Sequence, residues 1–359
     1  MRWSSSKSSL SSALLVCVAI ATLDAQSSRP PAARLVAAAR FVLPGEVDSS
    51  NPAVWSLVDG VARLFVISSW GGVPTRASGA SLDSLHGDGP VGFITHPGNG
   101  VWMEAIVPDA AGAWYGYYHH ERPADLCGRP DRQLPRIGAM RSVDQGRTWD
   151  DLGIVIDAPP GGEACDSANR FVLGGVGDVT AALDAASQDV FLYFSQYSKG
   201  IAQGVAVARL AWADRDAPVG KVSIWNNGAW LPVTESEGGW RFPPGTPLVA
   251  ATKPFHDRSA SDDVFWGPSI HWNTYLEQYV MLLNRAKNDQ FGQEGIYVSY
   301  SPTLSDPSRW TAPVKLMSGG EWYPQVIGEE TGTGTDRMAG RRARFFMTGR
   351  SDRWIEFER

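Results

Sequence analysis

Residues 142–149, which read SVDQGRTW, carry the clearest structural signal in this 359-residue chain. Asp144 and Gly146 suit a tight turn, because an Asp side chain can accept hydrogen bonds from backbone amides and Gly tolerates a positive φ angle. Thr148 and Trp149 favour the strand that follows such a turn. The stretch therefore predicts a β-hairpin whose turn is fixed by Asp144 and Gly146.

The same pattern, Ser-x-Asp-x-Gly-x-Thr-Trp, resembles the Asp box of β-propeller proteins such as sialidases. In those proteins the turn lies on the rim between two outer strands, far from the axis where ligands bind. The resemblance therefore implies a structural role for Asp144.

Paired strand-like segments recur along the whole chain, and long amphipathic helices are absent. The first segments of the pairs are residues 50–54, 102–106, 177–181, 266–270 and 322–326, and the apolar second segments are 63–67, 114–118, 190–194, 279–283 and 343–347. Each blade of a propeller begins with the strand nearest the axis and continues with an apolar second strand. Five pairs therefore predict an all-β fold, a five-bladed β-propeller, with loops that shape a cleft near residues 158–168 and 230–257.

The N-terminus has the features of a secretory signal. Arg2 and Lys7 precede an apolar run at 13–21, and small residues favour cleavage near Ala25. We expect a signal peptide at 1–25, one propeller domain at 26–359 and a secreted or periplasmic protein; a lipid anchor on Cys17 is a less favoured alternative. Export favours a disulfide between Cys127 and Cys165, the alternative being two free thiols.

Composition and net charge limit the classes of partner that this chain is expected to bind. The formal net charge is −6, which gives no electrostatic footprint for nucleic acid. No apolar segment after Ala25 approaches the ~20 residues that span a bilayer, so no membrane contact is expected after signal removal. We expect a monomer that binds carbohydrate.

The blade pattern resembles the five-bladed β-propeller glycoside hydrolases of the arabinanase and β-xylosidase type. In that family an Asp base, an Asp that tunes pKa and position, and a Glu general acid meet at the axis. The resemblance implies that Asp48 is the base and Asp178 the positioning acid. We assign the general acid to Glu104, because a carboxylate within an apolar strand is costly unless it is paired or faces water. Asp263 and Glu294 are the alternatives.

Further residues are candidates for contacts with the substrate. Trp102, Trp266, Trp322 and Tyr323 begin predicted inner strands and could pack against sugar rings. Asn51, Gln325 and Asp263 could bind hydroxyls, and His119 and His271 could hydrogen-bond a sugar or a carboxylate. His119 and His120 point to opposite sides of their strand, so we predict no metal site there. No catalytic cofactor is expected, and a structural calcium ion near His271 is left open.

Three functions fit these features. The favoured one is a secreted glycoside hydrolase that cleaves an oligo- or polysaccharide. A noncatalytic carbohydrate-binding propeller also fits, because function depends on the site and not on the fold. A sialidase-like enzyme is the third, but no predicted inner strand begins with the arginine that the carboxylate of its substrate would need.

Overall fold

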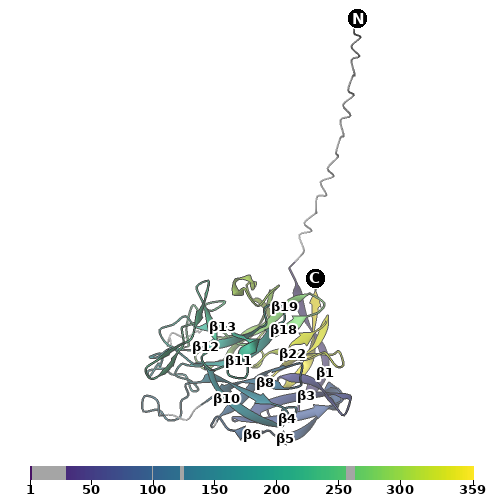
Figure 1. Ribbon diagram of the computed structural model, residues 1–359, viewed down its shortest axis with the longest axis horizontal. Coiled ribbons are helices and arrows are strands. Elements are labelled where there is room, and N and C mark those ends of the chain that lie inside the picture. The colour runs from purple at the N-terminus through teal and green to yellow at the C-terminus, as the bar shows by residue number, and fades with distance from the viewer. Residues whose placement is uncertain (2–29, 99, 122–124, 256–262) are drawn as a thin grey trace.

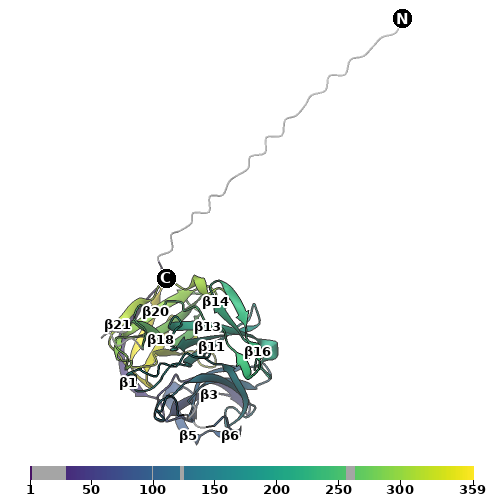
Figure 2. The same cartoon turned by 90° about the vertical axis from the view of Figure 1, so that its left-hand side faces the viewer.

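The computed structural model describes residues 1, 30–98, 100–121, 125–255 and 263–359. The predicted signal peptide, its cleavage site and Cys17 lie outside the described residues. The described chain is nearly all β, and its strands form five blades around a centre (Figures 1 and 2). The prediction of a five-bladed β-propeller is confirmed.

The first two blades come from the first half of the chain. Their innermost strands are β2 and β7, and every neighbouring pair is antiparallel except β10 with β6. The first blade contains β2 (Ala53–Val58), β3 (Val61–Trp70), β4 (Val73–Gly79) and β5 (His86–Pro90), and the second contains β7 (Val101–Pro108), β8 (Trp114–His120), β9 (Arg136–Ser142), β10 (Thr148–Ile156) and β6 (Gly92–Thr95).

The third and fourth blades begin at β11 and β18. The third contains β11 (Val176–Asp184), β12 (Asp189–Gln196), β13 (Gly204–Ala211), β14 (Ser223–Asn226) and β15 (Ala229–Pro232), and the hairpin β16 (Thr234–Ser236) and β17 (Gly239–Arg241) follows it. The fourth contains β18 (Val264–Asn273), β19 (Gln278–Ala286), β20 (Gln293–Ser301) and β21 (Val314–Ser318), with β23 (Met338–Ala339) beside β18. Single-turn 3₁₀ helices are η1 (Leu82–Ser84), η2 (Trp212–Asp214) and η3 (Pro307–Arg309).

The fifth blade joins the two ends of the chain. It contains β22 (Gln325–Gly328), β24 (Arg342–Met347), β25 (Arg350–Glu358) and, outermost, the N-terminal β1 (Ala32–Val42). Strand β1 runs antiparallel to β25, with Ala32 opposite Glu358, and the two lie side by side in Figure 1. The sequence did not predict this strand, which closes the ring.

The predicted hairpin joins β9 to β10. Asp144 Oδ1 accepts hydrogen bonds from the amides of Arg147 and Thr148, and Gly146 has a φ angle of 74°. The indole of Trp149 is fully buried and donates to the Gly146 carbonyl at 3.0 Å. The turn therefore also fixes a large core side chain between the first two blades, where Trp149 packs with Trp114 and Phe65.

The structure also contains the Cys127–Cys165 disulfide, which confirms that prediction. The bond ties the loop after β8 to the loop before β11, so it connects the second blade to the third. Among the described residues, no helix has the length and apolar character needed to cross a bilayer.

We expect Trp149→Ala to lower the free energy of unfolding by about 3–5 kcal/mol, because it removes a buried indole and leaves a cavity in the core. Urea denaturation of the purified protein measures this loss. Trp240→Ala is the matched control, since Trp240 is 40% exposed. Equal losses in the two variants would contradict the core role of Trp149.

Candidate active site

Two β-bulges place acids at the centre of the propeller. On β7, Met103 pairs with Tyr118 and Ala105 with Tyr117, so Glu104 is the extra residue. On β11, Gly177 and Val179 pair with consecutive residues of β12, so Asp178 is the extra residue, with a φ angle of 46°. A bulge redirects a side chain out of the regular alternation of a strand. The bulge on β7 therefore lets Glu104 bond the Val179 amide of β11 in the next blade, and the bulge on β11 redirects Asp178.

Asp178 needs a glycine before it. A Cβ atom on Gly177 would lie 2.4 Å from Nδ1 of His119, which is too close for any side chain. The absent side chain lets the His119 ring approach the backbone of β11, and the Asp178 amide donates to Nδ1 at 3.2 Å. Gly177 thereby brings the end of β8 against the start of β11.

A pocket opens beside these residues, and its lining combines acids with aromatic rings. The acids are Asp48, Glu121 and Asp178, with His119 beside them, and the other lining residues are Phe171, Val172, Tyr197, Trp266, Phe291, Trp322 and Tyr323. Several of the rings pack edge to face, with Trp266 and Phe291 centroids 4.9 Å apart. Three of the four predicted aromatic residues thus line the pocket. The fourth, Trp102, packs against the His119 ring instead.

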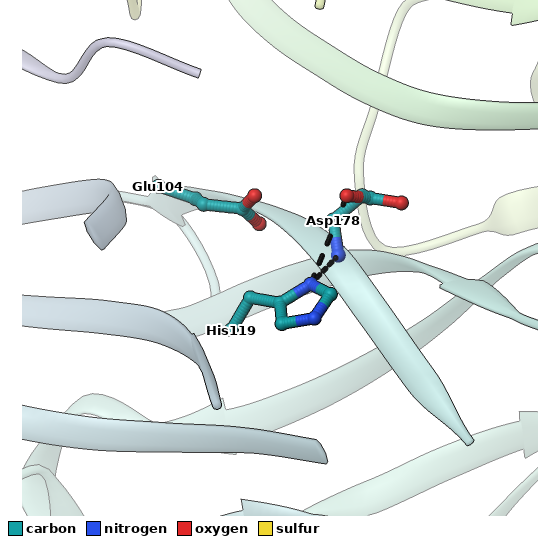
Figure 3. Close-up of side chains that lie close together, drawn as sticks. All are labelled: Glu104, His119 and Asp178. Carbon is teal, nitrogen blue, oxygen red and sulfur yellow. Dashed lines mark hydrogen bonds and ion pairs between the residues drawn. The ribbon is translucent and has the colours of Figure 1, made fainter. Parts of the chain in front are cut away.

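His119 connects the carboxylates. Its Nδ1 atom lies 3.7 Å from Asp178 Oδ1, and its Nε2 atom lies 3.4 Å from Glu121 Oε1. Figure 3 shows the imidazole beneath Asp178 with Glu104 beside them. The Tyr197 hydroxyl donates to the other oxygen of Asp178. The Asp178 carboxylate is therefore held from two sides.

Glu104 lies behind the pocket and does not line it. The residue is 3% exposed, and its Oε2 atom accepts a hydrogen bond from the Val179 amide at 2.5 Å. Burial raises the pKa of Glu104 well above its usual value, and the negative charge of Asp178 raises it further. Glu104 is therefore a buried acid whose protonated form is favoured.

Asp48 and His119 also have shifted pKa values. Burial raises the pKa of Asp48 to about 6, and the charges of Asp178 and Glu121 add to this while His119 opposes it. For His119, burial lowers the pKa, but its contacts with Asp178 and Glu121 outweigh burial and raise the pKa well above the usual value. The two acids beside the ring therefore outweigh the effect of burying it.

Glu104, His119 and Asp178 are spaced closely enough to hold a metal ion, since their candidate ligand atoms lie within 4.8 Å of one another. Two of those atoms are already occupied, because His119 Nδ1 and Glu104 Oε2 accept backbone hydrogen bonds. A metal ion would also have to displace the proton of His119. The donor set fits a hydrogen-bonded cluster better than a metal site.

Several predicted residues lie outside the pocket. The Asn51 amide donates to Gln325 Oε1 at 2.6 Å, so these two residues join the first and fifth blades. Asp263 is held by Arg285 and Thr252, and Glu294 by Lys315 and Tyr297. His271 is buried against Phe357, and burial lowers its pKa to about 3.

Sequence reasoning did not single out five of the lining residues, Glu121, Phe171, Val172, Tyr197 and Phe291. Phe171 and Phe291 lie in loops, where no strand pattern points to them. Tyr197 and Glu121 each follow directly after a second strand, β12 and β8. The position directly after a second strand is therefore the sequence signal that could have identified Tyr197 and Glu121.

The fold is shared with known proteins. An endo-arabinase from Bacteroides thetaiotaomicron superposes with a TM-score of 0.51 over 88% of this chain and 96% of that chain, at 12% sequence identity. An α-L-arabinofuranosidase from Lactobacillus brevis gives a TM-score of 0.48 over 85% of this chain and 89% of that chain, at 13% identity. The likeness to the endo-arabinase shows a common fold. No protein-family model and no curated protein matches the sequence.

We expect Glu104→Gln to change how stability depends on pH. The pKa of Glu104 is raised in the folded state. The stability that this carboxyl group contributes is therefore fully present below its pKa in the unfolded chain, about 4.3, and is lost as pH rises through its pKa in the folded protein. Glutamine keeps an acceptor for Val179 and has no proton to lose. The variant should therefore gain stability relative to the wild type as pH rises from about 4.5 to 8, measured by urea denaturation.

Glu294→Gln is the control for this experiment. Burial raises the pKa of Glu294, but Lys315 and Tyr297 outweigh it and lower the pKa. Its stabilising contribution is present above the unfolded pKa and is lost as pH falls, so the control should lose stability relative to the wild type toward neutral pH. A flat difference between wild type and Glu104→Gln would show that Glu104 is ionised in the folded protein.

Proposed function

We propose that the chain is a glycoside hydrolase that cleaves O-glycosidic bonds of an oligo- or polysaccharide in the central pocket. The observation that supports this most directly is the combination of carboxyl groups and aromatic rings in the lining of that pocket. Aromatic rings pack against the apolar faces of sugars, and facing carboxyl groups can donate one proton and accept another across a glycosidic bond. The fold shared with the endo-arabinase is in agreement.

Asp48 is the proposed general base. It lines the pocket, and its amide donates to the Ser69 carbonyl at 2.7 Å, which fixes its loop against β3. A pKa of about 6 leaves the carboxylate ionised at neutral pH and makes it a stronger base than an ordinary Asp. Asp48 would take a proton from the attacking water.

Asp178 is the proposed positioning acid. Tyr197 and His119 hold its carboxylate, and its negative charge raises the pKa of Asp48. Its bulge directs it into the pocket beside Asp48. Asp178 would therefore keep the base at a useful pKa and orient the sugar.

We also propose that the protein is exported to the periplasm or beyond. The predicted signal peptide and the Cys127–Cys165 disulfide support this, because such bonds persist in oxidising compartments. A sialidase-like activity has less support, since no arginine is among the described residues that line the pocket.

We expect the mature protein to release reducing sugar from one class of glycan in a panel of arabinans, xylans, fructans and sialylated glycans. Asp48→Asn should lower the rate about 10²–10⁴-fold, because the neutral amide cannot accept a proton from water. Asp178→Asn should cause a loss of similar order, because the positioning charge is gone.

Thermal unfolding of both variants checks that they remain folded. A wild-type protein that hydrolyses nothing but binds one of these glycans in calorimetry would identify a noncatalytic carbohydrate-binding propeller. Activity that survives both substitutions would overturn the proposed roles of Asp48 and Asp178.

We expect kcat/KM to fall as pH decreases below about 6, because Asp48 must be ionised to act as a base. Asp178 and Glu121 raise the pKa of Asp48, and His119 lowers it. Glu104 also interacts with the charge of Asp48. Initial rates between about pH 4 and 8 measure the acidic limb. A limb near 4, the ordinary Asp value, would contradict the role of Asp48.

A further inference from the structure

Glu121 is the third acid that lines the pocket, beside Asp48 and Asp178. It follows directly after β8, and its amide donates to the Gly100 carbonyl at 2.9 Å, which fixes it against the start of β7. Its side chain is 26% exposed, so the carboxyl group is open to the pocket. Among the described residues of the lining, no other has a carboxyl group that is accessible and still without an assigned role.

Glu104 differs from Glu121 in this respect. A general acid must come within hydrogen-bond reach of the oxygen that it protonates. Glu104 is 3% exposed, lies outside the pocket lining and already accepts the Val179 amide. Its protonated state suits an acid, but its position does not give it contact with a substrate.

His119 lies directly beside Glu121. Its Nε2 atom faces Glu121 Oε1 at 3.4 Å, without the alignment of a hydrogen bond, and this buried nitrogen makes no hydrogen bond to any described residue. A buried imidazole nitrogen without a hydrogen bond calls for a functional or structural explanation. Its opposite nitrogen is fixed by Asp178, so the ring cannot turn away from Glu121 without losing that contact.

We propose that Glu121, and not Glu104, protonates the leaving oxygen at this site, and that His119 is the positioning residue that holds Glu121 in place. The proposal rests on the glycosidase function proposed above. As the bond between the anomeric carbon and the leaving oxygen breaks, that oxygen takes the proton of Glu121. Water forms the new bond to the anomeric carbon, and its proton passes to Asp48. Asp48 then loses this proton to solvent and Glu121 takes one from solvent, which restores the starting state.

The dependence on the leaving group tests this assignment. Two substrates are used for each protein: the oligosaccharide that the wild type cleaves, and the dinitrophenyl glycoside of the same sugar, whose leaving group needs no proton. Glu121→Ala should lower kcat/KM for the oligosaccharide about 10²–10⁴-fold and for the dinitrophenyl glycoside by less than about tenfold. Glu104→Gln should affect the two substrates equally.

His119→Gln tests the positioning role. Without the imidazole, Glu121 is no longer held beside the leaving oxygen, so His119→Gln should lower kcat/KM more for the oligosaccharide than for the dinitrophenyl glycoside. A purely structural role of His119 would lower kcat/KM for both substrates by the same factor. Glu294→Gln, whose carboxylate is bound to Lys315 outside the pocket, is the matched control and should retain both activities.

The outcomes separate the two proposals. A wild type that cleaves neither substrate overturns the proposed function and this assignment with it. A wild type that cleaves both, together with equal losses on the two substrates in Glu121→Ala, overturns the assignment alone. A loss confined to the oligosaccharide in Glu104→Gln would return the acid role to Glu104. Circular dichroism of each variant identifies any that has failed to fold.

Discussion

The contacts of His119 with the acids around it are the interaction on which the central pocket depends. Four carboxyl groups gather there, and like charges held out of water raise one another's free energy. The imidazole lies between Asp178 and Glu121, while the raised pKa of Glu104 favours its neutral form. Gly177 makes the arrangement possible, because only a residue without a side chain lets the ring reach β11.

The acids and the aromatic rings of the pocket have different structural origins. The acids come from the first three blades, in the loop before β2, after β8 and on the bulge of β11. Most of the aromatic rings come from the fourth and fifth blades and from the loops beside them. The ring of blades therefore brings the two sets of residues into one pocket, although neither set comes from one continuous segment. Edge-to-face packing fixes the aromatic rings before any ligand arrives.

The sequence predicted the repeat well because each blade has its own apolar second strand. All five predicted pairs correspond to the two inner strands of a blade. It did not predict β1, whose Ala- and Arg-rich residues lack the apolar alternation of a strand and gain order only beside β25. Asp48, Asp178 and His119 were found because they flank predicted strands. The separation between Glu104 and Glu121 was not predictable, because a one-residue bulge leaves no pattern in the sequence.

The pairing of β1 with β25 has a consequence for how the chain folds during and after synthesis. Ala32 and Glu358 lie far apart in the sequence, yet they meet in one sheet. Contacts between such distant segments form late and slow folding. The fifth blade cannot be completed until β25 has been synthesised, and until then β1 has an unpaired edge that can associate with other chains. A nascent propeller of this design is therefore exposed to aggregation through β1 until β25 pairs with it.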